Sequence, residues 1–449
     1  MAAAADVTFN IELVGESDPF PGSPYYADVW AEGNYAYVGS DRPGGGIAIF
    51  DIFNPFEPQF VTMYPGDEME DVEVHNGIGY FGSDVLPTTS GTGVDIVNLS
   101  NPANPVRLSR VNALNGGHNK VHTLTVNKGF LYTADNATDV VKIFNVANPS
   151  SPQFVKSLDL GAPSGVASHE VVVSNDRLYV ASKDNDFTNC CGWTHIYDVA
   201  NPANPVLLKS FLSGPRSHTA TPTADGKTLI VAEERPNGNV HLYDISMINQ
   251  PNDPDTPALL KTLSRTSVGV DAHSPHHPHL HGNMLFLSWY EAGLQVFNIA
   301  DPANPVHVGG FDTYPGTNTL YYGNWGSFMG LGLSTVLLSD RQRGLIIVDA
   351  SELLTPGDFN QDGFVNGADY GAWRSEFNQD VFHHGTLTAD ANNDGFVDAA
   401  DYVVWRANSM AGGAAMSAAT VPEPASWVLL IAAGSSFLRR FLHSRCRAR

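Results

Sequence analysis

One short unit recurs along most of this chain, and its clearest copy reads Val296-Phe297-Asn298-Ile299-Ala300-Asp301-Pro302-Ala303-Asn304-Pro305-Val306. An apolar run ends at Asn298, and an Asp-Pro-x-x-Pro segment then leads into another apolar run. Asn and Asp side chains bond to nearby backbone and begin turns, while Pro fixes φ and cannot join a central strand. The unit therefore predicts a strand, a turn and a second strand.

Further clear copies of this unit begin at Phe50, Val97, Phe144 and Tyr197. Their spacing corresponds to a period of about 50 residues, and the segments between them are short, β-rich runs separated by Gly, Asn and Pro. A strand-rich repeat of this length is typical of a β-propeller in which each repeat forms one four-stranded blade.

The repeats predict a mainly β chain whose residues 1–353 form a seven-bladed β-propeller. The seventh repeat lacks a fourth strand before the composition of the chain changes. The N-terminal run at residues 10–15 parallels residues 306–310 of the sixth repeat, so we expect it to supply the missing strand. Ring closure by both ends of the chain would remove the only open sheet edge.

The turn units, together with the runs at residues 293–298 and 344–349, resemble the LVIVD-repeat proteins, and especially their choice-of-anchor B surface proteins. The resemblance covers roughly residues 10–353. It implies a propeller fold and supplies no settled activity.

The composition excludes several classes of protein. The 449 residues leave room for more than one domain, and 47 Asp and Glu against 24 Lys and Arg give a formal net charge of −23. This excess of acid argues against nucleic acid as a partner and suits a soluble protein in a calcium-containing medium. The three cysteines cannot form a disulfide framework.

Two acidic loops follow the last repeat, at residues 358–369 and 390–401. Each places oxygen-bearing side chains and a Gly at the spacing of a calcium loop, in which one further ligand is a backbone carbonyl. We therefore expect two calcium ions in an EF-hand-like arrangement. The expected ligands are Asp358, Asn360, Asp362, Phe364, Asn366 and Asp369 in the first loop and Asp390, Asn392, Asp394, Phe396, Asp398 and Asp401 in the second.

Each loop leads into a similar short helix, Asp369-Tyr370…Trp373-Arg374 and Asp401-Tyr402…Trp405-Arg406. The pair resembles a type I dockerin, which would make residues 354–408 a small α-helical domain. The resemblance implies a cohesin-type partner, contacted through Gly367, Ala368, Ala399 and Ala400. These residues are small and leave the identity of the partner open. The alternative is a domain that calcium stabilises and that binds no other partner.

The C-terminal segment reads as a linker at residues 409–420 and a tail at residues 421–449. The tail contains Pro422-Glu423-Pro424, an apolar run from Trp427 to Leu438, and then several arginines. The run of 12 residues is shorter than the roughly 20 that cross a bilayer comfortably. Basic residues beyond it would hold that end on the cytoplasmic side.

This tail resembles a PEP-CTERM sorting signal, which implies export, recognition by an exosortase and removal of the tail. A plain transmembrane anchor is the alternative, and both place the bulk of the chain outside the cytoplasmic membrane. After Met1, no basic region followed by an apolar run is visible, so the sequence shows no secretory signal. A start assigned too far downstream would reconcile the two ends.

Polar residues also recur at what the alignment of the repeats gives as one position of the inner strands. They are His122, His169, His218 and His276 in blades three to six and Asp28 and Asp71 in blades one and two. Equivalent positions on the innermost strands of a propeller line a common axis, so these side chains could converge. Imidazoles and carboxylates suit zinc, copper or iron. The alternative is a polar ring around a water-filled channel.

Common catalytic signatures, including Gly-x-Ser-x-Gly, the phosphate loop and His-Glu-x-x-His, are missing from the sequence. The sequence therefore favours an exported, non-catalytic surface protein that binds a partner, a carbohydrate or a surface polymer. The rival is a metal-dependent propeller enzyme, a hydrolase or an oxidase. A third hypothesis is a component of a polysaccharide-degrading complex, although no paired acidic motif for glycoside cleavage is evident.

Overall fold

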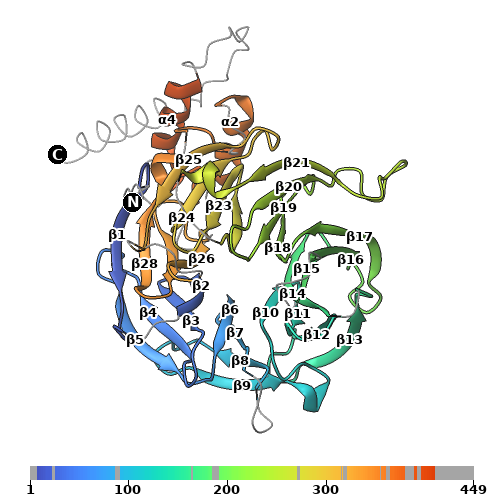
Figure 1. Ribbon diagram of the computed structural model, residues 1–449. Helices are drawn as coiled ribbons and strands as arrows, with labels where there is room; N and C mark the ends of the chain where they lie inside the picture. The colour runs from blue at the N-terminus through green and yellow to red at the C-terminus, as the bar shows by residue number, and fades with distance from the viewer. Residues whose placement is uncertain are drawn as a thin grey trace, which may run out of the picture. The chain divides into compact units, whose positions relative to one another are not determined.

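The computed structural model describes residues 8–22, 26–85, 92–162, 165–184, 192–269, 274–314, 316, 321–353, 355–359, 365–379, 389–391 and 396–409. In these residues, seven four-stranded antiparallel sheets are arranged in a ring (Figure 1). The prediction of a mainly β, seven-bladed propeller is confirmed. The expected C-terminal hydrophobic helix lies outside the described residues.

Six of the blades each consist of four strands that follow one another in the chain. The first three contain β2 (Tyr26–Glu32), β3 (Tyr35–Ser40), β4 (Ile47–Asp51) and β5 (Gln59–Tyr64); β6 (Met69–His75), β7 (Ile78–Ser83), β8 (Val94–Asn98) and β9 (Val106–Val111); and β10 (Thr123–Asn127), β11 (Phe130–Ala134), β12 (Val140–Asn145) and β13 (Gln153–Asp159). The next three contain β14 (Val166–Ser174), β15 (Arg177–Asp184), β16 (Gly192–Asp198) and β17 (Val206–Gly214); β18 (Ser217–Pro222), β19 (Thr228–Glu233), β20 (Val240–Asp244) and β21 (Ala258–Leu263); and β22 (Pro278–His281), β23 (Met284–Ser288), β24 (Leu294–Asn298) and β25 (Val306–Phe311).

The seventh blade joins the two ends of the propeller. Its strands β26 (Asn324–Phe328), β27 (Val336–Asp340) and β28 (Gly344–Asp349) are followed in the sheet by β1 (Glu12–Ser17). Figure 1 shows the blue β1 beside the orange β28, and the two strands pair antiparallel from Glu12 opposite Asp349 to Ser17 opposite Leu345. The outermost strand of this blade therefore comes from the start of the described chain.

The same turn chemistry ends the third strand of every blade. An Asp or Asn there accepts a hydrogen bond through Oδ1 from the backbone N–H two residues later, at 2.8–3.0 Å. These residues are Asp51, Asn98, Asn145, Asp198, Asp244, Asn298 and Asp349. Such a side chain stabilises the turn locally, which explains why Asp and Asn recur in the repeat unit.

The hydrophobic core lies between neighbouring blades. One cluster, for example, combines Leu345 and Ile347 of blade seven with Val38 and Phe50 of blade one, and all four are fully buried. Fourth strands are more exposed than the strands inside them, as in β5, whose first two residues are exposed. Each blade therefore depends for its packing on both neighbours, and the ring must close for the first and last blades to be covered.

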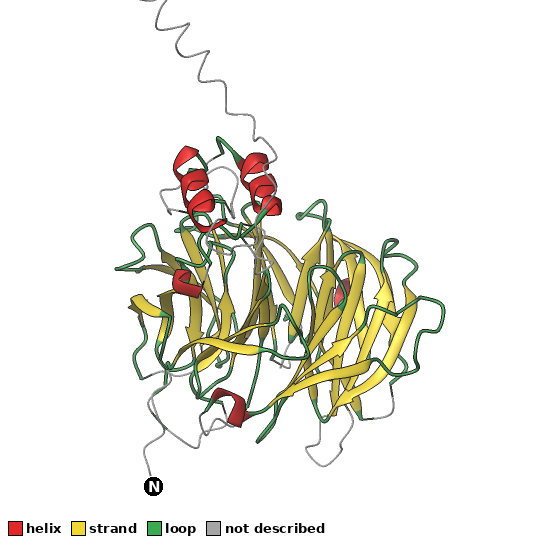
Figure 2. Cartoon of the chain, turned by 90° about the horizontal axis from the view of Figure 1, so that it is seen from above, coloured by secondary structure: helices red, strands yellow, loops and turns green. Residues whose placement is uncertain are grey.

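The helical elements of the described residues are short. Helices α2 (Gly367–Glu376) and α4 (Ala399–Ser409) belong to the C-terminal module, and Figure 2 shows both in red. Phe359, Ala389 and Val397 form the small core of this module. Three single turns, η1 (Ala113–Asn115), α1 (Arg265–Val268) and η2 (Ser351–Leu353), complete the regular structure of the described residues.

Removal of residues 1–20 is expected to lower the melting temperature of the propeller strongly, because it takes β1 and the buried Ile11 from the closing blade. Ile11 is 2 % exposed, so Ile11→Ala alone should cost about 2–5 kcal/mol of stability. Leu13→Ala is the matched control, since Leu13 is 48 % exposed. Thermal unfolding followed by circular dichroism measures both effects. Unchanged melting after the deletion would show that β1 does not close the ring.

Candidate functional site

An irregularity in strand pairing recurs at the same place on the inner strands. The register of β14 shifts between Ser168 and Glu170, and that of β18 shifts between Ser217 and Thr219. The residues inside these bulges are His169 and His218. Equivalent shifts in β6 and β26 bracket Glu70 and Trp325. Bulges re-aim side chains and are common beside functional sites.

His122 and His276 stand at the corresponding place, one residue before β10 and two residues before β22. The backbone N–H of His122 donates to the carbonyl of Ala134, and that of His276 donates to the carbonyl of Ser288, at 2.9 Å each. The structure therefore brings His122, His169, His218 and His276 to one level of four consecutive blades.

Asp28 and Asp71 lie one residue further along their strands than the sequence alignment placed them. Asp71 follows the bulge and pairs with Gly82, as Glu170 follows its bulge and pairs with Ala181. Counted from the second strands, Asp71 stands seven residues before β7, whereas His122 and His169 stand eight residues before β11 and β15. The blade-two residue at the level of the histidines is Glu70, which the sequence did not single out.

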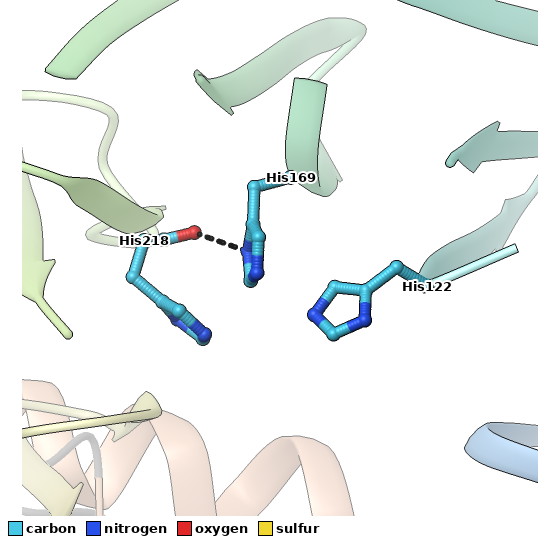
Figure 3. A group of neighbouring side chains, drawn as sticks. All are labelled: His122, His169 and His218. Carbon is cyan, nitrogen blue, oxygen red and sulfur yellow. Dashed lines mark hydrogen bonds between the residues drawn. The ribbon is translucent and has the colours of Figure 1, made fainter. Parts of the chain in front are cut away.

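The four imidazoles are in contact with one another in sequence order. Ring centroids are 4.2 Å apart for His122 and His169, 4.0 Å for His169 and His218, and 4.4 Å for His218 and His276. Figure 3 shows the side chains of His122, His169 and His218 pointing toward one another from separate blades. His169, His218 and His276 are at most 2 % exposed.

Backbone hydrogen bonds determine which nitrogen of two rings carries hydrogen. The Nδ1–H of His169 donates to the carbonyl of His218 at 3.2 Å, and the Nδ1–H of His276 donates to the carbonyl of Trp325 at 2.6 Å. A carbonyl can only accept, so Nε2 of each neutral ring carries a lone pair directed away from the backbone.

The electrostatic surroundings keep three of the four histidines neutral and raise the pKa of the fourth. Burial lowers the pKa of His169, His218 and His276 well below the usual value, and neighbouring cationic groups lower it further, so these rings are neutral. Burial would also lower the pKa of His122, but the carboxylates of Asp84 and Glu70 overcome this effect and raise it to about 10. Their oxygens lie 3.2 and 3.1 Å from Nδ1 of His122.

A buried ionic network borders the imidazoles. Glu234 lies 3.2 Å from Nζ of Lys183, 3.6 Å from Nε2 of His218 and 3.7 Å from the guanidinium of Arg216. The hydroxyl of Tyr290 donates to Glu234 at 3.1 Å. Sequence reasoning missed these residues because they stand at the ends of second strands and in turns, where the repeat unit gives no fixed residue type.

A cavity of about 360 Å³ lies at the next level of the inner strands. The charged and imidazole side chains among its described lining are Asp28, Asp71, Glu73, Glu170, His277, His279 and His281. His277 connects the cavity with the imidazole group, because its ring is 4.0 Å from that of His276 and its Nε2 is 3.2 Å from Glu170.

Asp28 and Asp71 also link neighbouring blades. Asp28 accepts a hydrogen bond from the backbone N–H of Val72 at 3.3 Å, and Asp71 accepts one from that of Leu124. Burial raises the pKa of Asp28 to about 7 and that of Asp71 well above the usual value. The described contacts of both carboxyl groups are therefore structural.

The described parts of the acidic loops fit calcium. Asp369 and Asp401, which close the two loops, are 0 % exposed, and each accepts a hydrogen bond at 2.7 Å from the backbone N–H of the residue three positions earlier. Buried carboxylates need a compensating charge, and the donors of both loops are hard oxygens. Asn360, Asp362, Phe364, Asn392 and Asp394 lie outside the described residues.

The two loop–helix units bind each other reciprocally. The indole N–H of Trp373 donates to the carbonyl of Asp398 in the second loop, and that of Trp405 donates to the carbonyl of Asn366 in the first, both at 2.8 Å. The expected partner residues Gly367, Ala368, Ala399 and Ala400 are exposed at the starts of α2 and α4.

Comparison with known families identifies both modules. Residues 356–405 match the Dockerin type I domain, and residues 25–65, 119–159 and 165–213 match the LVIVD repeat. The chain contains LVIVD repeats and a dockerin type I domain. No curated protein matches the chain.

Similar solved structures are similar in fold alone. Hydrazine Synthase from Kuenenia stuttgartiensis has a TM-score of 0.55 at 8% identity, covering 74% of this chain and 96% of its own. A protein from Lactobacillus plantarum has a TM-score of 0.51 at 12% identity, covering 73% and 87%. A putative 6-phosphogluconolactonase from Bacteroides fragilis has 0.50 at 14%, covering 74% and 92%.

The C-terminal tail with Pro422, Glu423 and Pro424 lies outside the described residues. In the part of the chain that the structure describes, no helix combines the length and the apolarity needed to cross a membrane.

The buried Asp28 predicts a pH-dependent contribution to stability. Its pKa of about 7 in the folded chain exceeds that of Asp in an unfolded chain, about 3.9, so between these values the folded state keeps a proton that the unfolded state has lost. The contribution of Asp28 therefore falls as the pH rises from about 4 to about 7. Asp28→Asn keeps an oxygen for the N–H of Val72 and removes the titration.

Denaturant unfolding at about pH 5 and about pH 8 tests this effect. The Asp28→Asn protein should gain stability relative to the unchanged protein as the pH rises. Asp159→Asn, at an exposed position whose turn hydrogen bond Asn can also accept, is the control. An identical difference for Asp28→Asn at both pH values would contradict the assignment.

Proposed function

We propose that this chain is an exported surface protein that docks to a cohesin-type partner in a calcium-dependent manner and presents its propeller as a recognition module. The observation that carries the proposal is the dockerin type I match at residues 356–405, which includes the closing residues of both loops. A dockerin domain joined to a propeller is in general the organisation of a surface or complex-associated protein.

Two calcium ions would hold the docking module together. The side chains of Asp358, Asn366 and Asp369 and their counterparts Asp390, Asp398 and Asp401 supply oxygen ligands at matching loop positions. Without a cation these carboxylates repel one another, so folding of the module should depend on calcium. The reciprocal tryptophan hydrogen bonds would transmit disorder in one loop to the other.

The partner would contact the exposed first turns of α2 and α4. Gly367, Ala368, Ala399 and Ala400 present little side-chain surface there, so a cohesin-type module could approach the helix backbones closely. The related sequences of the two turns also offer the partner two similar surfaces.

The propeller would bind its ligand at the cavity on the inner strands. Its volume of about 360 Å³ falls in the range of small-molecule pockets. The aromatic rings of Trp30 and Phe328, with centroids 4.9 Å apart, stand among hydrogen-bonding carboxyl and hydroxyl groups in its lining. This mixture suits the sugar units of a carbohydrate or another hydroxyl-rich surface polymer.

Calcium-dependent docking is tested by calorimetric titration of the full chain with a panel of cohesin modules. Binding is expected in calcium and should disappear after chelation, or in a double variant carrying Asp369→Asn and Asp401→Asn. Asp159→Asn is the control because it lies outside the dockerin domain. Equal binding with and without calcium, or failure of every cohesin tested, would contradict the docking proposal.

Export and sorting would follow from the C-terminal segment. We propose that an exosortase recognises Pro422-Glu423-Pro424 and removes the tail beyond about residue 424. The intact mass of surface material from the native host should then lack Arg449. A full-length mass would leave only an ordinary anchor.

A second candidate function is a metal-dependent propeller enzyme, a hydrolase or an oxidase, and the contact of four imidazoles favours it. A transition metal there would adjoin the cavity through His277. Such an enzyme would turn over ester or phenol substrates and lose turnover in His169→Ala, whereas a recognition module would bind ligand without turnover. A role in a polysaccharide-degrading complex is compatible with either function.

A further inference from the structure

We infer that the propeller channel binds one transition-metal ion through His122, His169 and His218. The inference deepens the second candidate function, because that enzyme requires the ion, while binding of the ion does not require catalysis. It is independent of calcium in the docking module.

The ligand atoms are already close enough to share an ion. One nitrogen from each of these three rings lies within 4.8 Å of the other two. Imidazole nitrogens bind zinc at about 2.0–2.1 Å, so in a tetrahedral arrangement two of them are roughly 3.4 Å apart.

The surroundings of the rings orient their nitrogens as a metal site requires. The Nδ1–H of His169 donates to a backbone carbonyl, and Nδ1 of His122 faces the carboxylates of Glu70 and Asp84 at 3.1 and 3.2 Å. Metal-bound histidines usually donate their second N–H to a carbonyl or a carboxylate. Nε2 is therefore the nitrogen that both rings would offer to the ion, and His122 would release a proton on binding it.

Buried nitrogens without a partner support the same conclusion. Among the described residues, Nε2 of His169 and Nδ1 of His218 make no hydrogen bond, although these side chains are 0 % and 1 % exposed. A polar atom that is buried without a partner destabilises the fold, and a bound ion removes that cost by accepting its lone pair. Two such atoms in one group of touching rings favour a shared ligand.

The charges around the rings suit a divalent cation. Glu70 and Asp84 lie beside His122, and Glu170 and Glu234 approach His218 to 3.9 and 3.6 Å. Lys183 and Arg216 are both within 3.7 Å of Glu234, which leaves Glu70 and Glu170 without a Lys or Arg among the described ion pairs.

The donor set indicates the class of metal. Three imidazoles favour zinc, copper, nickel or iron and disfavour calcium, which prefers oxygen ligands. Three protein ligands also leave a tetrahedral ion one position for water or substrate, which is the arrangement of catalytic zinc sites.

A neighbouring group, His218, His276 and His277, also has nitrogens within 4.8 Å of one another. Nε2 of His277 already faces Glu170 at 3.2 Å, and the rings of His276 and His277 stack with an interplanar angle of 19°. Stacked rings cannot both direct a lone pair at one ion between them. The first group is therefore the better site, and variants of the second can test the choice.

The experiment uses the full chain, produced with added zinc and then measured by elemental analysis for zinc, copper, nickel, iron and calcium separately. We expect about one transition-metal ion per chain and its loss in His122→Ala, His169→Ala or His218→Ala. Replacement of zinc by cobalt(II) should give the visible absorption of tetrahedral cobalt in the unchanged protein and not in these variants. His307→Ala, whose ring binds Gln295 in the outer part of blade six, is the control.

Glu70→Gln keeps the test valid if the histidine variants do not fold. Loss of this carboxylate should weaken zinc affinity about 10–100-fold while the propeller stays folded. Folded, zinc-supplemented protein without a transition metal would overturn the inference. So would metal that is retained in His122→Ala but lost in His277→Ala. Bound metal without turnover would support the site and reject the enzyme, and turnover without transition metal would do the reverse.

Discussion

The antiparallel pairing of β1 with β28 is the contact on which the rest of the propeller depends. Each blade buries its apolar faces against two neighbours, so an unclosed ring would expose the core between blades one and seven. The histidines of blades three to six lie on the inner side of this same ring.

A second constraint acts at the inner strands themselves. There the side chain of one blade repeatedly hydrogen-bonds the backbone of the next, as Asp28 does with Val72, Thr123 with the carbonyl of His169, and His169 with the carbonyl of His218. Polar residues at these levels thus satisfy backbone groups that face the channel. The bulges turn the side chains of His169 and His218 toward the channel.

These two constraints separate the tasks of the chain. The propeller provides a rigid frame in which imidazoles and carboxylates meet without a flexible loop, and the dockerin domain provides a separate site for hard cations. The two kinds of metal ligand lie in different modules. The propeller channel offers mainly imidazole nitrogen at the level of the histidines, and the acidic loops offer the hard oxygen ligands. The two modules therefore offer ligands to different classes of metal.

Much of the fold could be predicted from the sequence because its signals are local. The Asp and Asn residues that end the third strands act on backbone two residues away, and the spacing of their repeats counts the blades. The recurrence of His122, His169, His218 and His276 was equally visible. The level of Asp28 and Asp71 was misjudged by one residue, because Asp71 stands seven residues before β7, whereas His122 stands eight residues before β11. Glu70, Glu234 and Lys183 were missed because the contacts that define their roles join residues of neighbouring blades that lie far apart in the sequence.

Anomalous X-ray diffraction from crystals of the zinc-loaded full chain tests the central claim most directly. A zinc peak is expected in the channel about 2.0–2.1 Å from Nε2 of His169, with His122 and His218 completing the protein ligands. Ordered, unliganded imidazoles in crystals grown with excess zinc, with no anomalous peak in the channel, would contradict it.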